Sequence, residues 1–166
     1  MFELKPLSHE SVDAALEKMR HYRALNEPRE AESICRDILA TDPDNREAFI
    51  NLILALTDQF VEKLGPAVEE AGSLVTRLQT EYERSYYSGI VAERRAKAQL
   101  SRGAPGCGSV AYEGLLKAMA WYEIAEKVRP PGDDNAILRW NTCARLIMQE
   151  DQLRPAPTDD GSLMLE

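Results

Sequence analysis

Few side chains in this 166-residue sequence could act as nucleophiles, bases or metal ligands, because it contains only three cysteines and two histidines. His9 and His21 have no Cys, His or carboxylate at a zinc-ligand spacing beyond what chance provides. A Cys–His nucleophile would require Cys107 to meet one of them, and no motif supports that pairing. Cys35 and Cys143 stand at apolar positions of helical patterns and are predicted to be buried free thiols. We therefore predict a protein that is not an enzyme, with no catalytic residue, metal or cofactor.

A glycine-rich segment, residues 102–109, could be taken for a phosphate-binding loop. No strand precedes its glycines, and no Gly-Lys-Ser/Thr follows them, so the elements of such a loop are missing. We interpret the segment as a long turn between two helices, with Cys107 in the turn and Ser109 as the cap of the next helix.

Composition limits the compartments and partners to consider. The net charge of −8 and the pI near 4.9 oppose binding to a phosphate backbone, so nucleic acid is not an expected partner. The longest apolar stretch, residues 48–56, is interrupted by Asn51 and is far shorter than the ~20 residues of a membrane span. Residues 1–6 lack the pattern of a secretory signal, which leads us to expect a cytoplasmic protein without a membrane partner.

The periodicity of apolar residues predicts an all-α chain. Apolar side chains recur at spacings of three and four, and proline, glycine and capping residues separate the runs. Asp44 with Glu47 has the form of a capping box, and Gly65-Pro66 marks a break before a further helix. The predicted helices cover residues 8–25, 28 to just before 43, 44–60, 66–81, 83–100, 109 to just before 130, and 133–152.

Two of these helices carry the same pattern of small, bulky, apolar and proline residues. Offsets of four and three keep the first three side chains on one helical face, and the proline falls after the helix has ended. Each pattern therefore predicts the second helix of a helical hairpin. The two sets are Ala31, Cys35, Ile38 and Pro43, and Ala118, Tyr122, Ala125 and Pro130.

With the turn Asp42-Pro43-Asp44-Asn45, this pattern resembles the tetratricopeptide repeat family. The resemblance implies a right-handed α-α superhelix of about three helical hairpins with a C-terminal capping helix. We expect one domain over residues 8–152 and a flexible tail over 153–166. The middle hairpin lacks the terminal proline, so whether it is a true repeat stays open. The tail segment Leu163-Met164-Leu165 is either a short docking motif or an inert terminus.

Members of this family bind peptides or helices on a concave surface that the first helix of each hairpin lines. The positions expected on that inner side are mostly arginines, whose forked N–H groups suit carboxylates, so the implied partner is a protein or peptide of acidic character. The alternative is a solvated face whose arginines pair with Glu17, Glu47 and other carboxylates. The inner-side residues are Arg20, Arg23, Asn51, Arg95, Arg139 and Arg145.

Trp121 and Tyr122 are adjacent in a predicted helix and cannot both face the core. One of them should be exposed, and an exposed aromatic ring is a natural anchor for a partner, so Trp121 joins the predicted binding residues. The function implied is a non-catalytic adaptor or scaffold. The alternatives are a structural subunit that self-associates through its repeat ends as a homo-oligomer, and a small-ligand sensor or enzyme.

Overall fold

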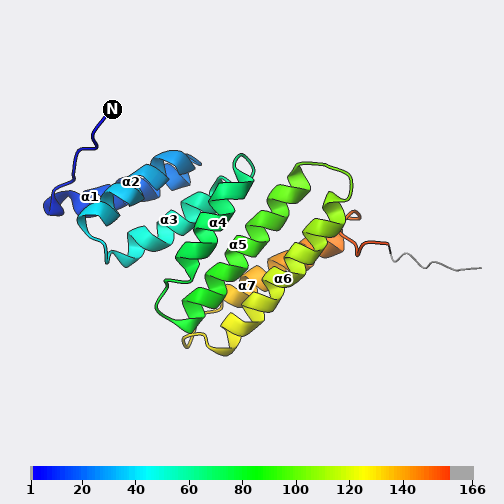
Figure 1. Cartoon of the computed structure of the whole chain (residues 1–166). Coiled ribbons are helices and arrows are strands. Elements are labelled where there is room, and N and C mark those ends of the chain that lie inside the picture. The colour runs from blue at the N-terminus through cyan, green and yellow to red at the C-terminus, as the bar shows by residue number, and fades with distance from the viewer. Residues whose placement is uncertain (1, 158–166) are drawn as a thin grey trace, which may run out of the picture.

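The computed structural model describes residues 2–157, and within them every regular element is helical (Figure 1). The predicted all-α class is therefore confirmed for the described part of the chain. A short 3-10 helix, η1 (His9–Ser11), precedes the α-helices. These are α1 (Val12–Ala24), α2 (Pro28–Thr41), α3 (Arg46–Asp58), α4 (Leu64–Val75), α5 (Glu81–Ser101), α6 (Cys107–Lys127) and α7 (Asn135–Gln149).

The helices form a row in which each packs against the next along the chain (Figure 1). In addition, α1 contacts α3 and α3 contacts α5. An ion pair between Arg139 and Glu93 joins α7 to α5, and one between Arg36 and Glu70 joins α2 to α4. Odd-numbered and even-numbered helices thus form two layers.

Local sequence explains where most helices begin. Pro28 stands in the first turn of α2, where its missing N–H is not needed. Asn45, rather than the expected Asp44, caps α3, because its side-chain oxygen accepts a hydrogen bond from the backbone N–H of Ala48. A reciprocal capping box of Thr80 and Glu83 begins α5.

Helix α4 departs furthest from its predicted bounds, and the start of α6 also differs. Helix α4 includes Gly65 in its first turn and ends at Val75 instead of near residue 81, and the residues that follow lead into the cap of α5. Helix α6 begins at Cys107 after Gly106, whose φ of 78° lies in the left-handed region that favours glycine. Cys107 is therefore helical, and Ser109 is not the cap.

The core consists of two clusters, one built mainly by α1–α4 and one by α5–α7. Leu54 and Tyr87 pack against both clusters and connect them. The repeated pattern lies at the centre of each cluster, where none of its apolar members is more than 1% exposed. These members are Ala31, Cys35 and Ile38 in the first cluster and Ala118, Tyr122 and Ala125 in the second.

Gly89 permits the close packing of α5 against α6. A Cβ atom placed on Gly89 would lie 2.4 Å from a ring carbon of Tyr122, so only glycine leaves room for the ring. At the far end of the chain, Leu153 is 2% exposed and packs into the second cluster, so the packed region continues past residue 152. The tail motif, residues 163–165, lies outside the described residues.

Within residues 2–157, none of the helices combines the length and apolar character that a bilayer crossing requires.

Candidate functional site

The arginines predicted for one concave surface are divided between two faces of the molecule. On the odd-numbered layer, Arg20 Nε and Nη2 donate to the two carboxylate oxygens of Glu47 at 2.5 and 2.7 Å. Arg23 donates to Asp58 at 3.0 Å and to the side-chain oxygen of Asn51 at 3.2 Å. The structure brings Arg20, Arg23 and Asn51 together, but in bonds between α1 and α3. These pairs join neighbouring helices, whereas the alternative expected carboxylates at helical spacing.

Arg139 belongs to the same layer and faces a buried carboxylate. Its Nη1 lies 3.3 Å from Glu93 Oε1, and Lys97 Nζ lies 2.5 Å from the same oxygen. Tyr122 Oη donates to Glu93 Oε2 at 2.7 Å, and the Glu93 side chain is 0% exposed. Burial raises the pKa of Glu93, but the hydrogen bonds from Lys97 and Tyr122 and the nearby cations outweigh it, so its pKa is lowered.

Arg145 lies further along α7, where it lines a small hollow together with Lys97. The α5 arginine on this face is Arg94, whose Nη1 donates to Asp58 Oδ1 at 3.0 Å. The prediction selected Arg95, one position further on. One residue corresponds to a rotation of about 100° around a helix, which places Arg95 on a different face. Sequence reasoning thus missed Arg94 and Lys97 as residues of this surface, although the basic run in α5 pointed to the region.

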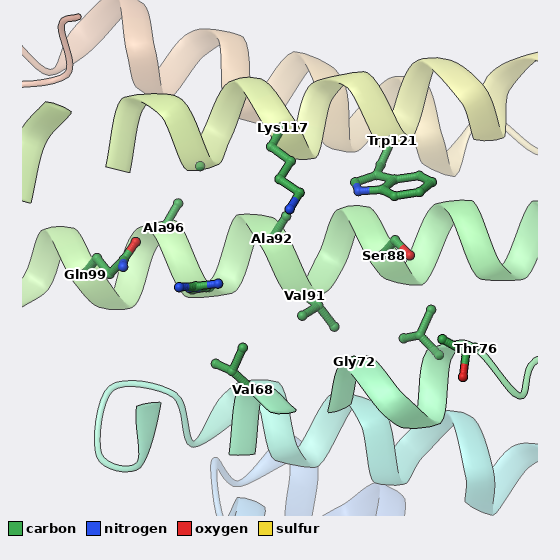
Figure 2. A pocket seen from close by; sticks show the side chains of 13 residues that line it. Val68, Gly72, Thr76, Ser88, Val91, Ala92, Ala96, Gln99, Lys117 and Trp121 are labelled. Carbon is green, nitrogen blue, oxygen red and sulfur yellow. The ribbon is translucent and has the colours of Figure 1, made fainter. Parts of the chain in front are cut away.

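Arg95 lines a groove whose floor is α5 and whose walls are α4 and α6 (Figure 2). We call it the α4–α6 groove. Its volume is about 280 Å³, and Trp121 from α6 borders it. The structure therefore brings together two of the predicted binding residues, away from the other five. The full lining comprises Val68, Gly72, Val75, Thr76, Ser88, Val91, Ala92, Arg95, Ala96, Gln99, Gly114, Lys117 and Trp121.

Small residues on three helices create the hollow. Gly72, Ala92 and Gly114 face it with little or no side chain, so no bulky group fills the space between α4 and α6. A Cβ atom on Gly114 would lie 2.9 Å from the Cβ of Ala96, which shows how closely α6 approaches the floor of the groove. The hollow is therefore a consequence of helix packing at small residues.

The charged residues of the α4–α6 groove are cationic. Arg95 and Lys117 are exposed, and neither belongs to an ion pair among residues 2–157. Among the described residues, none that lines the groove carries a carboxylate. Figure 2 shows Lys117 and Trp121 extending from α6 toward α5, Lys117 near Ala92 and Trp121 near Ser88. An apolar floor beside an indole ring and two free cations is suited to binding an anionic, partly apolar group.

None of the three cysteines lines the α4–α6 groove. Cys35 and Cys143 are buried free thiols, and burial raises the pKa of each to about 12, so the thiolate form is disfavoured. Within the described residues, no three His, Cys, Asp or Glu side chains are arranged to hold a metal ion.

No protein-family model, curated protein or solved structure matches this chain.

Proposed function

We propose that this chain is a non-catalytic protein-interaction module that binds an acidic, partly apolar segment of a partner protein in the α4–α6 groove. The observation that supports this most is the combination of an apolar hollow, the half-buried Trp121 ring and two cations, Arg95 and Lys117, that form no ion pair within residues 2–157. The local positive charge is notable because the chain as a whole carries a net charge of −8. A partner attracted to the protein as a whole would be basic, whereas this groove selects acidic groups.

The size of the groove indicates what enters it. Its volume of about 280 Å³ is close to the lower end of ~300–1,000 Å³ for ligand pockets. It therefore accommodates a few side chains of the partner rather than a whole helix. Aliphatic side chains would contact Trp121 and Val91, and burial of such anchors supplies most of the affinity in protein interfaces.

The cations would determine which segments bind. Arg95 comes from α5 and Lys117 from α6, so an acidic residue on either side of the apolar anchor meets a positive charge. Exposed charges of this kind mainly increase the association rate and exclude basic competitors.

We further propose that the scaffold is a right-handed stack of three tetratricopeptide-like hairpins with α7 as its capping helix. The alternation of contacts between neighbouring helices and the buried repeat pattern support this arrangement. The binding surface we propose differs from the concave surface expected for the family. Arg20, Arg23 and Arg139 already pair with carboxylates of neighbouring helices, so an acidic peptide there would compete with the protein's own side chains.

The test is a peptide-display selection against the intact protein from a random library, followed by affinity measurements on the enriched sequences. Enriched peptides should combine Asp or Glu with aliphatic residues. Trp121→Ala and Lys117→Glu should each weaken their binding about tenfold or more. Arg154→Glu is the matched control, because Arg154 is exposed, lies outside the groove and, among residues 2–157, pairs only with Asp151.

Two results would overturn the proposal. One is a selection that yields no binder, or binders without acidic residues. The other is acidic binders whose affinity is the same for the intact protein and for Lys117→Glu.

A further inference from the structure

A second hollow of about 200 Å³ lies among α3, α5 and α7, on the odd-numbered layer. Three of its lining residues are cations, namely Arg94 and Lys97 from α5 and Arg139 from α7. Asp58 is the one carboxylate in the lining that the described part of the chain provides. We call this hollow the α3–α7 pocket. It is separate from the α4–α6 groove, since Arg94 and Arg95 point to different faces of α5.

The ion pairs around the α3–α7 pocket leave positive charge uncompensated. Asp58 pairs with both Arg23 and Arg94, at 3.0 Å each. Glu93 pairs with both Lys97 and Arg139, at 2.5 and 3.3 Å. Two carboxylates thus share four cations, which leaves an excess of two positive charges. Arg145, in the adjoining hollow that Lys97 also lines, adds a further cation.

The same bonds hold the cations in place without using all their hydrogen-bond donors. An arginine has five N–H donors and a lysine has three. Arg94 donates one N–H to Asp58, and Lys97 donates one to Glu93. The side chains of Arg94, Lys97 and Arg139 are 32, 35 and 31% exposed, so a ligand can reach them. Cations already fixed by partners lose less conformational entropy when they bind an anion.

We propose that the α3–α7 pocket binds a phosphoryl dianion, either inorganic phosphate or the phosphate group of a small monoester. The two negative charges of the ligand oppose the excess positive charge around the pocket. A tetrahedral oxyanion can accept hydrogen bonds from two helices at once, which suits the planar donors of Arg94 and Arg139. The volume of about 200 Å³ fits a compact anion and is too small for a folded peptide.

The experiment is isothermal titration of the full chain with inorganic phosphate, glycerol 3-phosphate and acetate at constant ionic strength. Phosphate and glycerol 3-phosphate should each bind saturably at one site per chain, whereas the monoanion acetate should bind at least tenfold more weakly. Weaker binding of glycerol 3-phosphate than of phosphate would identify free phosphate as the ligand, and the reverse would identify a monoester. Affinity for the monoester should rise between pH 5 and pH 7, as its second proton with a pKa near ~6 is lost.

Substitution of single arginines tests whether phosphate binds in the α3–α7 pocket. Arg94→Gln and Arg145→Gln should each reduce affinity for phosphate about fivefold or more, and Arg95→Gln, the neighbouring arginine on the other face of α5, should leave it unchanged. Arg145 lines the adjoining hollow and belongs to no ion pair among the described residues, so its variant removes a nearby positive charge without breaking an ion pair of the fold.

Absence of saturable phosphate binding would overturn this proposal. So would an affinity for acetate equal to that for phosphate, or a loss of phosphate affinity in Arg95→Gln equal to that in Arg94→Gln. A selected acidic peptide that lost affinity in Arg94→Gln, in a protein that bound no phosphate, would assign this face to peptides instead. Peptide binding in the α4–α6 groove is judged by Lys117→Glu, so either proposal can fail without the other.

Discussion

The hydroxyl group of Tyr122 donates a 2.7 Å hydrogen bond to the carboxylate of Glu93, which joins α6 to α5 inside the second core cluster. Both side chains are buried, with exposed fractions of 1 and 0%. Lys97 and Arg139 complete the shell of donors around the carboxylate. A buried charge is tolerated only when such partners replace its water, so the position of each partner matters for stability.

Removing the hydroxyl should be costly because it leaves a buried charged acceptor with one donor fewer. We expect Tyr122→Phe to lower the free energy of unfolding by about 2 kcal/mol, as measured by urea denaturation. Tyr112→Phe is the control on the same helix, since the Tyr112 hydroxyl makes no hydrogen bond to another described residue. Equal losses in the two variants would show that the bond to Glu93 contributes nothing.

Stability should depend on pH through Glu93. Its pKa in the folded protein is below the ordinary 4.5, so its ionisation favours folding above that pH and the contribution is lost as the pH falls through the folded pKa. The difference in unfolding free energy between the intact protein and Glu93→Gln should be largest near pH 7 and should shrink below pH 4.5. Urea denaturation at a series of pH values from 7 to 3 measures this difference. A difference that stayed constant with pH would contradict the lowered pKa of Glu93.

Gly89→Ala should destabilise the fold by about 1–3 kcal/mol, because the new methyl group would collide with the Tyr122 ring. Gly72→Ala is the matched control, since Gly72 lies inside α4 and a Cβ atom there meets nothing within 4 Å. That control should be neutral or slightly stabilising, as alanine is the better helix former. Thermal unfolding distinguishes the two, and a neutral Gly89→Ala would contradict the close packing of α5 and α6.

The three thiols should react at different rates. Cys35 and Cys143 are buried with a pKa of about 12, whereas Cys107 is partly exposed at the start of α6. A thiol reagent at pH 8 should label one cysteine rapidly and the other two only on unfolding. Cys107→Ser should remove the rapid phase, and a rapid phase that persisted would mean that a core thiol is accessible.

The sequence was a good guide to helices and core. Offsets of four and three correctly placed Cys35 and Tyr122 in the core. The spacing of apolar residues along a helix directly indicates which face is buried. It also indicated that only one of Trp121 and Tyr122 would be buried, and Tyr122 is the buried one. Capping was less predictable, since Asp44 and Asn45 are both good caps and only the backbone geometry selects Asn45.

The candidate sites were harder to predict. The choice between Arg94 and Arg95 depends on the rotation of α5, which a one-residue error changes by about 100°. The pairing of Arg23 with Asp58 depends on how neighbouring helices pack, and no local spacing reports it. The α4–α6 groove arises where small residues of three separate helices meet, so its existence became visible only in three dimensions.

The most direct test of the α4–α6 groove uses Trp121 itself as the probe. The chain has two tryptophans, and Trp140, whose indole N–H donates to Glu123, lies outside the groove. In Trp140→Phe, titration with an acidic peptide from the display selection should shift Trp121 emission to the blue as the ring is covered. The peptide concentration at the midpoint of the titration should be at least tenfold higher in the double variant that also carries Lys117→Glu. Unchanged Trp121 emission on saturation with a bound peptide would contradict the account.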